Sequence, residues 1–221
     1  MLRCADGVWL LPSLVPHLIN CYLLETEIGD VLIDAGTRWG TARLLRVLAG
    51  RNLALVGLTH VHPDHQGAAA AVCRRFGVPL ACHTADADIM EGTSPVRPRT
   101  WIVRLGQKLL AGPPHPVARC LHDGDQLAEW RIVHTPGHTT GHVIYFRERD
   151  RVAIAGDLVR SRFGPWPGVI EPPHFFSADP AQNRRSLRLL LALRPSLVCL
   201  GHGPPLGDLT PLERLAERFG V

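Results

Sequence analysis

The feature that most constrains the fold is a cluster of metal-binding side chains directly after an apolar stretch. Residues Ala54–Thr59 have the composition of a buried strand, and residues 60–65 then read His-Val-His-Pro-Asp-His. Imidazole and carboxylate groups are common zinc ligands. A strand end followed by a loop can direct all of them into one crevice. The segment therefore predicts a metal site at the edge of a sheet.

Three later segments place a histidine or an aspartate at a strand end in the same way. Residues 135–142 read Thr-Pro-Gly-His-Thr-Thr-Gly-His, another strand ends in Gly156 and Asp157, and the last strand is followed by His202 between two glycines. Glycine beside a ligand permits a tight turn and close approach of the backbone. Open sheets often hold their sites at the carboxyl ends of strands, so we expect these segments to meet.

Strand-like and helix-like segments alternate along the chain. Apolar and alternating runs predict strands at Val8–Leu11, Leu18–Glu25, Val31–Asp34, Ala54–Thr59, Val78–Cys82, Trp130–His134, Val143–Arg147, Val152–Ala155 and Leu197–Leu200. Helical spacing predicts helices at Thr41–Ala49, Gly67–Phe76, Ala85–Glu91, Trp101–Leu110, from Ser177 or Asp179 to about Leu193, and at Pro211–Phe219. With 221 residues, no repeats and no linker, the chain is expected to form a single domain over residues 1–221, of the layered α/β (α+β) class.

The composition excludes several classes of protein. The chain is 46% hydrophobic with a formal net charge of +4, and its basic residues are scattered, so no nucleic-acid partner is expected. Its six cysteines form no C-x-x-C pair and are interpreted as small buried apolar side chains. No charged-then-apolar leader opens the chain and no apolar run is as long as a membrane span, which predicts a cytoplasmic protein.

In this order and spacing the four elements resemble the metallo-β-lactamase superfamily. The resemblance covers nearly the whole chain, including Asp34 in the Asp-Ala-Gly turn ahead of the first ligands. It implies a four-layer αββα sandwich with the site at one edge of the two sheets. It also implies the ligands of two zinc ions: His60, His62 and His138 for the first, Asp64, His65 and His202 for the second, and Asp157 as a bridge between them.

Within the superfamily the chain is most similar to the small glyoxalase-II-like hydrolases, through residues 135–142 and 201–203. The first hypothesis is a dinuclear zinc hydrolase that cleaves an ester, thioester, lactone or related acyl bond with a metal-bridging hydroxide, with Asp64 and His202 as catalytic residues. A glyoxalase II carries a C-terminal helical extension, whereas this chain has one helix after His202, which argues against glutathione-thioester specificity.

Three alternatives belong to other reaction classes. A persulfide-dioxygenase-like enzyme would use one Fe²⁺, held by His62 or its neighbour, His138 and Asp157. A nuclease or phosphodiesterase of this superfamily would carry a large substrate domain that is not visible here. A β-lactamase proper would usually act outside the cytoplasm. The metal content separates the iron enzyme from the zinc hydrolase.

The segment Pro95–Val117 is the best candidate for a lid over the substrate. Its apolar residues Trp101, Ile102, Leu105 and Leu109 could cover the metals, and its basic residues Arg97, Arg99, Arg104 and Lys108 would suit an anionic small molecule. The alternatives are that it caps the core or forms a homodimer contact. The segment Gly164–Phe176, with His174, could also overhang the site. Candidate substrate-binding residues are therefore Trp101, Arg104 and His174.

Overall fold

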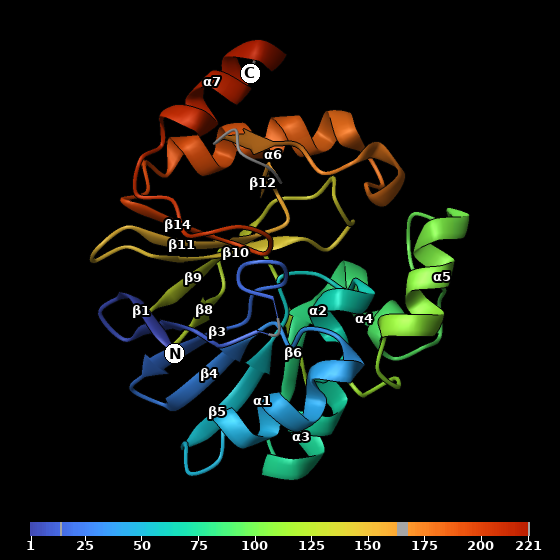
Figure 1. The fold of residues 1–221 in the computed structure, drawn as a ribbon. Coiled ribbons are helices and arrows are strands. Elements are labelled where there is room, and N and C mark those ends of the chain that lie inside the picture. Colours follow the sequence, from blue (N-terminus) through green and yellow to red (C-terminus); the bar gives the residue numbers. More distant parts are fainter. Residues whose placement is uncertain (14, 163–167, 221) are drawn as a thin grey trace.

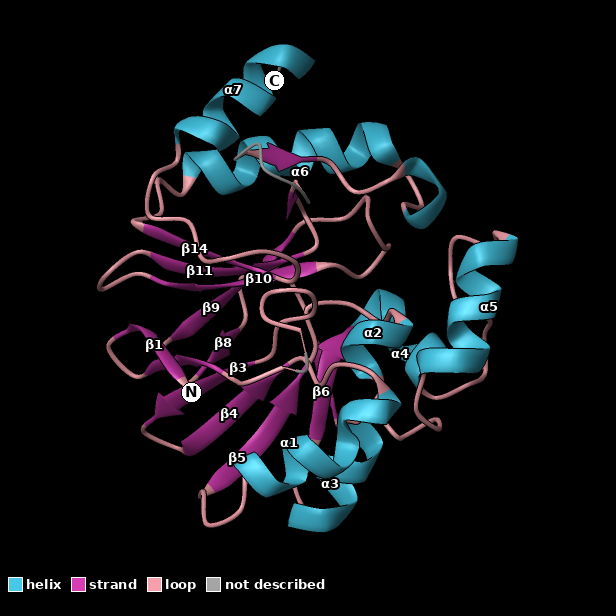
Figure 2. Ribbon diagram, viewed as in Figure 1, coloured by secondary structure: helices cyan, strands magenta, loops and turns pink. Residues whose placement is uncertain are grey.

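Two sheets lie face to face, with helices on the outer side of each (Figure 1). The computed structural model describes residues 1–13, 15–162 and 168–220. Viewed by secondary structure, the order of layers is helix, sheet, sheet, helix (Figure 2). This is the αββα sandwich that the sequence predicts.

The first sheet is antiparallel in its first half and parallel in its second. Its strands follow the chain order: β1 (Leu2–Ala5), β2 (Val8–Leu10), β3 (Tyr22–Thr26), β4 (Gly29–Ile33), β5 (Leu53–Gly57), β6 (Leu80–His83) and β7 (Arg119–Leu121). The pairs from β1 to β4 are antiparallel, and those from β4 to β7 are parallel. Helices in the parallel half include α1 (Thr41–Val47), α2 (Pro63–Gln66), α3 (Ala69–Phe76) and α4 (Thr84–Met90).

The second sheet comes mainly from the C-terminal half of the chain. Its order is β14 (Leu197–Leu200), β11 (Val152–Gly156), β10 (Val143–Arg147), β9 (Trp130–His134) and β8 (Gln126–Leu127). β14 pairs with β11 in parallel, and the other neighbours are antiparallel. Its outer face carries α6 (Pro180–Ala192) and α7 (Thr210–Phe219) (Figure 1).

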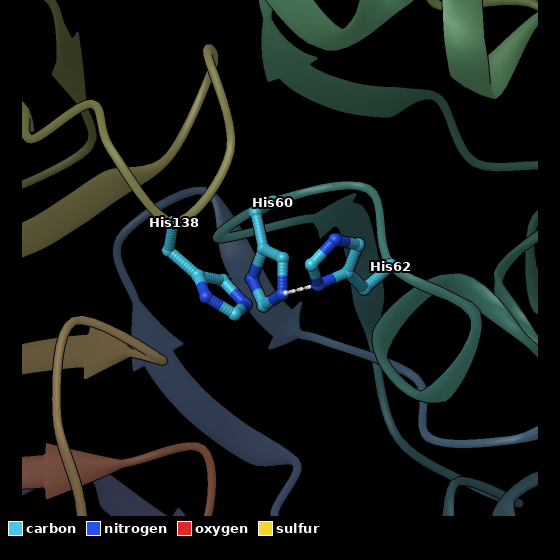
Figure 3. A group of neighbouring side chains, drawn as sticks. All are labelled: His60, His62 and His138. Carbon is cyan, nitrogen blue, oxygen red and sulfur yellow. Dashed lines mark hydrogen bonds between the residues drawn. The ribbon is translucent and has the colours of Figure 1, made fainter. Parts of the chain in front are cut away.

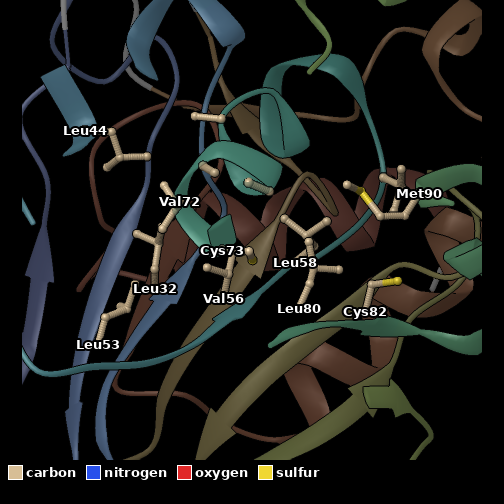
Figure 4. Close-up of a cluster of buried hydrophobic side chains, with 14 of the residues drawn as sticks. Leu32, Leu44, Leu53, Val56, Leu58, Val72, Cys73, Leu80, Cys82 and Met90 are labelled. Carbon is tan, nitrogen blue, oxygen red and sulfur yellow. The ribbon is translucent and has the colours of Figure 1, made fainter. Parts of the chain in front are cut away.

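Three apolar clusters fill the spaces between the four layers. Successive side chains of a strand point to opposite faces, and both faces of the sheets are covered here. In β4, Leu32 packs toward α1 and α3, while Val31 and Ile33 pack between the sheets. In β10, Tyr145 packs between the sheets, and Phe146 packs toward α6 and α7. Figure 4 shows the first of these clusters.

The remaining elements are one longer helix beside the two sheets and several short elements. The helix α5 (Trp101–Leu110) lies to one side of the sandwich (Figure 1). Two short helical turns, η1 (Arg38–Gly40) and η2 (His174–Phe176), precede α1 and α6. A small ribbon pairs β12 (Arg160–Ser161) with β13 (Val169–Ile170). Among the described residues, no helix has both the length and the apolar character needed to cross a bilayer.

The predicted elements match the observed ones except in two respects. The strand predicted at Leu18–Glu25 is wrong at its start, because residues 16–18 form a turn and β3 begins at Tyr22. The short strands β1, β7, β8, β12 and β13 and the short helices α2, η1 and η2 were not predicted. The cysteines are free, and Cys73, Cys82 and Cys199 are buried as expected, but Cys120 on β7 is exposed.

Candidate metal centre

The candidate site lies where four strands end at one edge of the sandwich. β5 ends before His60, and the following turn and α2 carry the other ligands of the first motif. β9, β11 and β14 run in the same direction in the second sheet and end just before His138, Asp157 and His202. The four segments that the sequence analysis singled out are therefore brought together, as predicted from their positions at strand ends.

The potential ligand atoms gather in two separate groups of three, and a third group, made of His60, His65 and Asp157, connects them. The donor atoms of His60, His62 and His138 lie within 4.8 Å of one another, and so do those of Asp64, His65 and His202. In the first group the Nε2 of His60 and the Nδ1 of His62 are 3.1 Å apart (Figure 3). The first group is fully buried, whereas Asp64 and His202 of the second are partly exposed.

The carboxylate of Asp157 lies between the two groups. Its Oδ1 is 3.3 Å from the Nε2 of His65, and its Oδ2 is 3.1 Å from the Nε2 of His202. The same Oδ2 is 3.7 Å from the Nε2 of His138, in the other group. The backbone here leaves no room for a side chain opposite Asp157, because a Cβ on Gly201 would lie 2.1 Å from Oδ1. This is the arrangement expected of a bridging carboxylate.

A shared hydrogen-bond network orients two of the histidines. Asp34 accepts hydrogen bonds from the Nδ1 of His65 at 2.9 Å and from the hydroxyl of Thr59 at 2.8 Å. The Thr59 hydroxyl oxygen is in turn 3.1 Å from the Nδ1 of His60. Both rings are thereby held so that Nε2 faces the centre. Asp34 thus orients a candidate ligand, and it belongs to none of the groups of candidate donors.

The other three histidines are held in the same way through one ring nitrogen. The Nε2 of His62 donates to the carbonyl of Arg97 at 2.9 Å, which leaves Nδ1 for the centre. The Nδ1 of His138 is 3.3 Å from the hydroxyl of Ser177, and the Nδ1 of His202 donates to the carbonyl of Leu18. Fixing one nitrogen selects the tautomer that presents the other as a ligand.

Several buried polar atoms at the centre lack a hydrogen-bond partner among the described residues. They are the Nε2 of His138 and, facing each other at 3.3 Å without a hydrogen bond, the Nε2 of His65 and the Oδ1 of Asp157. Buried polar atoms are nearly always hydrogen-bonded, so unpartnered atoms that converge on one point call for a ligand. Nitrogen and carboxylate donors in groups of three are suited to divalent metal ions such as zinc or iron. The donor set therefore fits the metals that the sequence predicts.

The electrostatics divide the centre into a neutral half and a charged half. Burial, reinforced by neighbouring imidazoles, lowers the pKa of His60 and of His138 well below the usual value, so these rings are neutral, as metal binding requires. Burial also opposes the charged form of His202, but the carboxylates of Asp157 and Asp64 outweigh it and raise its pKa to about 10. The carboxylates thus create a strong attraction for positive charge.

The carboxylate of Asp86 connects two of the ligand-bearing loops. It is fully buried, and its Oδ2 accepts hydrogen bonds from the backbone N–H of Val61 at 3.1 Å and from the hydroxyl of Thr139 at 2.7 Å. Its Oδ1 accepts from the N–H of Gly141 at 2.8 Å and from the hydroxyl of Thr140 at 3.2 Å. Val61 lies between two candidate ligands, and Thr139 follows a third. Asp86 was not predicted from the sequence, because it resembles an ordinary acidic residue in the first turn of a helix, here α4.

A second supporting residue is His142. Its Nε2 accepts a hydrogen bond from the backbone N–H of Asp157 at 3.2 Å, and its Nδ1 is 2.8 Å from the hydroxyl of Thr135. Burial lowers its pKa to about 3, so the ring is neutral and can accept this bond. His142 therefore positions the backbone of Asp157 and lies outside the groups of candidate donors.

A pocket of about 460 Å³ opens onto the metal centre. One wall consists of candidate ligands, and the opposite wall is apolar and comes largely from α5, together with residues before α6. The described lining residues include the candidate ligands His62, Asp64, His138, Asp157 and His202, the apolar residues Ile19, Ile102, Leu105, Leu109, Pro172 and Phe176, and also Arg160. An apolar pocket with a few converging polar groups is typical of a small-molecule site.

The three residues that the sequence suggested for substrate binding lie outside this lining. Trp101 is 75% exposed at the start of α5, and Arg104 lines a separate hollow with Gln107 and Lys108. His174 is 63% exposed and forms an ion pair with Glu171. Of the residues in the predicted lid, Ile102, Leu105 and Leu109 line the pocket, whereas Trp101 and Arg104 do not, because they project from other faces of the helix. Part of the segment predicted to overhang the site, residues 164–167, lies outside the described residues.

Replacing Gly106 with leucine should narrow the pocket without disturbing the metals. Gly106 lines the pocket on α5, and a Cβ there would meet only the Cγ of Pro63, at 3.8 Å. We expect unchanged metal content, a helix stabilised by up to about 1 kcal/mol, and kcat/KM reduced by about tenfold or more for bulky substrates. Steady-state kinetics with small and bulky substrates would measure this, with Gly106→Ala as control. Equal kcat/KM for both substrate sizes in the leucine variant would show that substrate does not pass α5.

Comparisons with known proteins agree with this geometry. The family model described as the metallo-beta-lactamase superfamily matches residues 14–202. The chain is 29% identical to the probable metallo-hydrolase YybB of Bacillus subtilis, over 86% of this chain and 83% of that protein. It is 33% identical to a hydroxyacylglutathione hydrolase of Acidiphilium cryptum, over 70% of this chain but only 52% of that enzyme.

A solved structure has a similar fold. The crystal structure of TTHA1623 in a di-iron-bound form superimposes with a TM-score of 0.70 and 32% sequence identity, covering 94% of this chain and 96% of that one. The family match and the metallo-hydrolase relatives identify a metal-dependent hydrolase. The chain belongs to the metallo-beta-lactamase superfamily.

Proposed function

We propose that this protein is a hydrolase with two metal ions that cleaves an ester, thioester, lactone or related acyl bond. The single observation that carries the proposal is the position of Asp157 between two groups of three donors. When bound, such a metal pair supplies a hydroxide nucleophile at neutral pH and an electrophile for the carbonyl oxygen. The substrate would be a small molecule in the pocket beside α5.

The proposed ligands are those expected from the superfamily resemblance. His60, His62 and His138 would hold one ion, Asp64, His65 and His202 the other, and Asp157 both. Zinc is the proposed metal, since imidazole and carboxylate donors suit it. Iron is the alternative, and the di-iron form named for TTHA1623 supports two ions of that metal as well. Either metal is compatible with a site of two ions.

The chain's own residues would orient the substrate and move the proton. The apolar wall of Ile102, Leu105 and Leu109 would exclude bulk water from the acyl bond. The carboxylate of Asp64 lines the pocket 3.4 Å from the Nε2 of His202. We propose that this carboxylate accepts the proton of the attacking water. The water oxygen joins the acyl carbon, the C–O or C–S bond breaks, and the leaving group departs with a proton.

We propose the class of bond that is cleaved, and not an individual substrate. The chain spans about half the length of the hydroxyacylglutathione hydrolase it matches, so the glutathione thioester named for that relative is not carried over. A panel of thioesters, lactones, simple esters and β-lactams would identify the bond. Oxygen uptake with glutathione persulfide by an iron-loaded protein, with none of the panel hydrolysed, would instead indicate a dioxygenase.

Replacing Asp64 with alanine should abolish hydrolysis and weaken one metal ion. The variant loses both a proposed ligand and the proposed proton acceptor, so we expect kcat to fall by about 10²–10³-fold. Elemental analysis should find about one metal ion per chain after dialysis. Asp6→Ala is the matched control, because Asp6 is exposed and pairs only with surface arginines. Wild-type turnover with full metal content in Asp64→Ala would refute the assignment.

A further inference from the structure

A second hollow lies beside the metal pocket, between η1, α1 and the segment before β3. Its volume is about 270 Å³. Most of its described lining is apolar and includes Leu11, Val15, Leu18, Ile19, Leu44 and Val47, with Trp39 at its rim. The one charged side chain among the described lining residues is Arg43, whose guanidinium donates to the carbonyl of Ser13 at 2.9 Å. We call this hollow the tail groove.

The tail groove and the metal pocket share part of their walls. Leu18 and Ile19 line both. On another side, the indole N–H of Trp39, in the groove, donates to the carbonyl of Leu109, in the pocket, at 2.8 Å. Leu18 also accepts the hydrogen bond from His202 through its backbone carbonyl. The groove is therefore built onto the same segments that shape the candidate metal centre.

The groove leaves large apolar side chains in contact with water. Val15 is 51% exposed, Leu18 40% and Trp39 70%. Single exposed apolar residues are ordinary, but several around one concave surface mark a binding site. Leu105 and Leu109, across the pocket, are exposed as well. The apolar surface thus continues from the groove past the metal centre to α5.

We propose that the tail groove binds the unbranched apolar tail of an acyl substrate whose reacting carbonyl lies at the metal centre. This inference rests on the proposed hydrolase function and names its substrate class: esters or thioesters of medium-chain fatty acids. A polar leaving group would find little to bind in the groove, because its described lining offers a single cation that is already bonded to a carbonyl. The acyl side of the scissile bond therefore faces the groove, and the leaving group faces away from it.

The expected signature is a dependence on chain length. Each methylene group transferred from water into an apolar site can raise kcat/KM by up to about fourfold. We therefore expect an octanoyl ester to be hydrolysed with at least about tenfold higher kcat/KM than a butyryl ester of the same alcohol. The same preference should appear in binding, which does not require turnover.

Gly40 offers a clean way to fill the groove. It lines the groove with φ −81°, a conformation open to any residue, and a Cβ there would meet nothing within 4 Å. Leucine at this position should occupy the groove and leave the metal pocket unchanged. Gly207 is the matched control, because it is exposed, lies outside the groove and the pocket, and has equally open space for a Cβ.

The test compares octanoate with butyrate by isothermal titration calorimetry on the metal-loaded protein, alongside the two esters. We expect wild type and Gly207→Leu to bind octanoate at least about tenfold more tightly than butyrate, and Gly40→Leu to bind both equally. Equal affinities in wild type, or an octanoate preference that survives Gly40→Leu, would overturn the groove assignment. So would a change in particle mass caused by Gly40→Leu in sedimentation, which would indicate a second copy in the groove. Failure to hydrolyse either ester, with the binding preference intact, would count against the hydrolase function alone.

Discussion

Replacing Asp157 with alanine is expected to reduce acyl hydrolysis by at least about 1,000-fold, because it removes the side chain between the two donor groups. Loss of a single transition-state donor already costs about 10²–10³-fold. Asp157 is within 3.3 Å of His65 and within 3.1 Å of His202. Without its charge, both ions would be bound more weakly. Steady-state kinetics and elemental analysis of the same sample would measure the two effects together.

Asp157→Asn makes this prediction more specific. The amide keeps the shape of the carboxylate but lacks its charge, and one of its two polar atoms is a donor that cannot bind a metal. We expect Asp157→Asn to retain more bound metal than Asp157→Ala. Its activity should lie between those of Asp157→Ala and wild type. If Asp157→Ala bound two ions and kept kcat within tenfold of wild type, Asp157 would have no bridging role.

Replacing Asp86 with alanine should destabilise the protein by about 3–5 kcal/mol and loosen the metals. The substitution leaves four donors without their acceptor, two of them backbone N–H groups of Val61 and Gly141. Unsatisfied buried donors are costly, and loss of a group that supports metal ligands typically lowers metal affinity by about 10- to 100-fold. Chemical denaturation and competition with a metal-binding dye would give the two values.

Two further variants separate positioning by Asp86 from loss of stability. Leu212→Ala removes a fully buried side chain of α7. It belongs to the apolar cluster between the second sheet and its outer helices. It should cost a similar free energy of unfolding, about 3 kcal/mol, without changing metal affinity. Thr139→Val removes one of the four donors and should give a smaller loss of affinity than Asp86→Ala. A metal affinity that is lowered equally by Leu212→Ala would show that Asp86 acts only through stability.

The layers and the candidate ligands could be predicted because their signals are local. Strands such as Trp130–His134 and Val143–Arg147 alternate between two buried faces, and their bounds were predicted without error. The donors of residues 60–65 follow one strand directly. Their meeting with Asp157 and His202 follows from a general rule about strand ends and from the family resemblance.

What the sequence did not reveal depends on contacts between distant segments. Asp86 binds groups 25 and 53–55 residues away, and nothing in the sequence around it indicates these partners. Leu18 and Ile19, at the end of the turn, were predicted as strand because they are apolar. Their exposure and their place between groove and pocket come from tertiary packing. The amphipathic pattern of α5 likewise left open which of its residues face the pocket.

The most direct test of the two-metal hydrolase is a titration of metal-free protein with Zn²⁺, followed by hydrolysis of the best thioester or ester from the panel. Elemental analysis at each point relates activity to bound metal. We predict that activity reaches its plateau when two ions are bound per chain, and that the plateau is lost in Asp157→Ala. A plateau at one ion per chain, or activity restored only by iron and accompanied by oxygen uptake, would contradict the proposal.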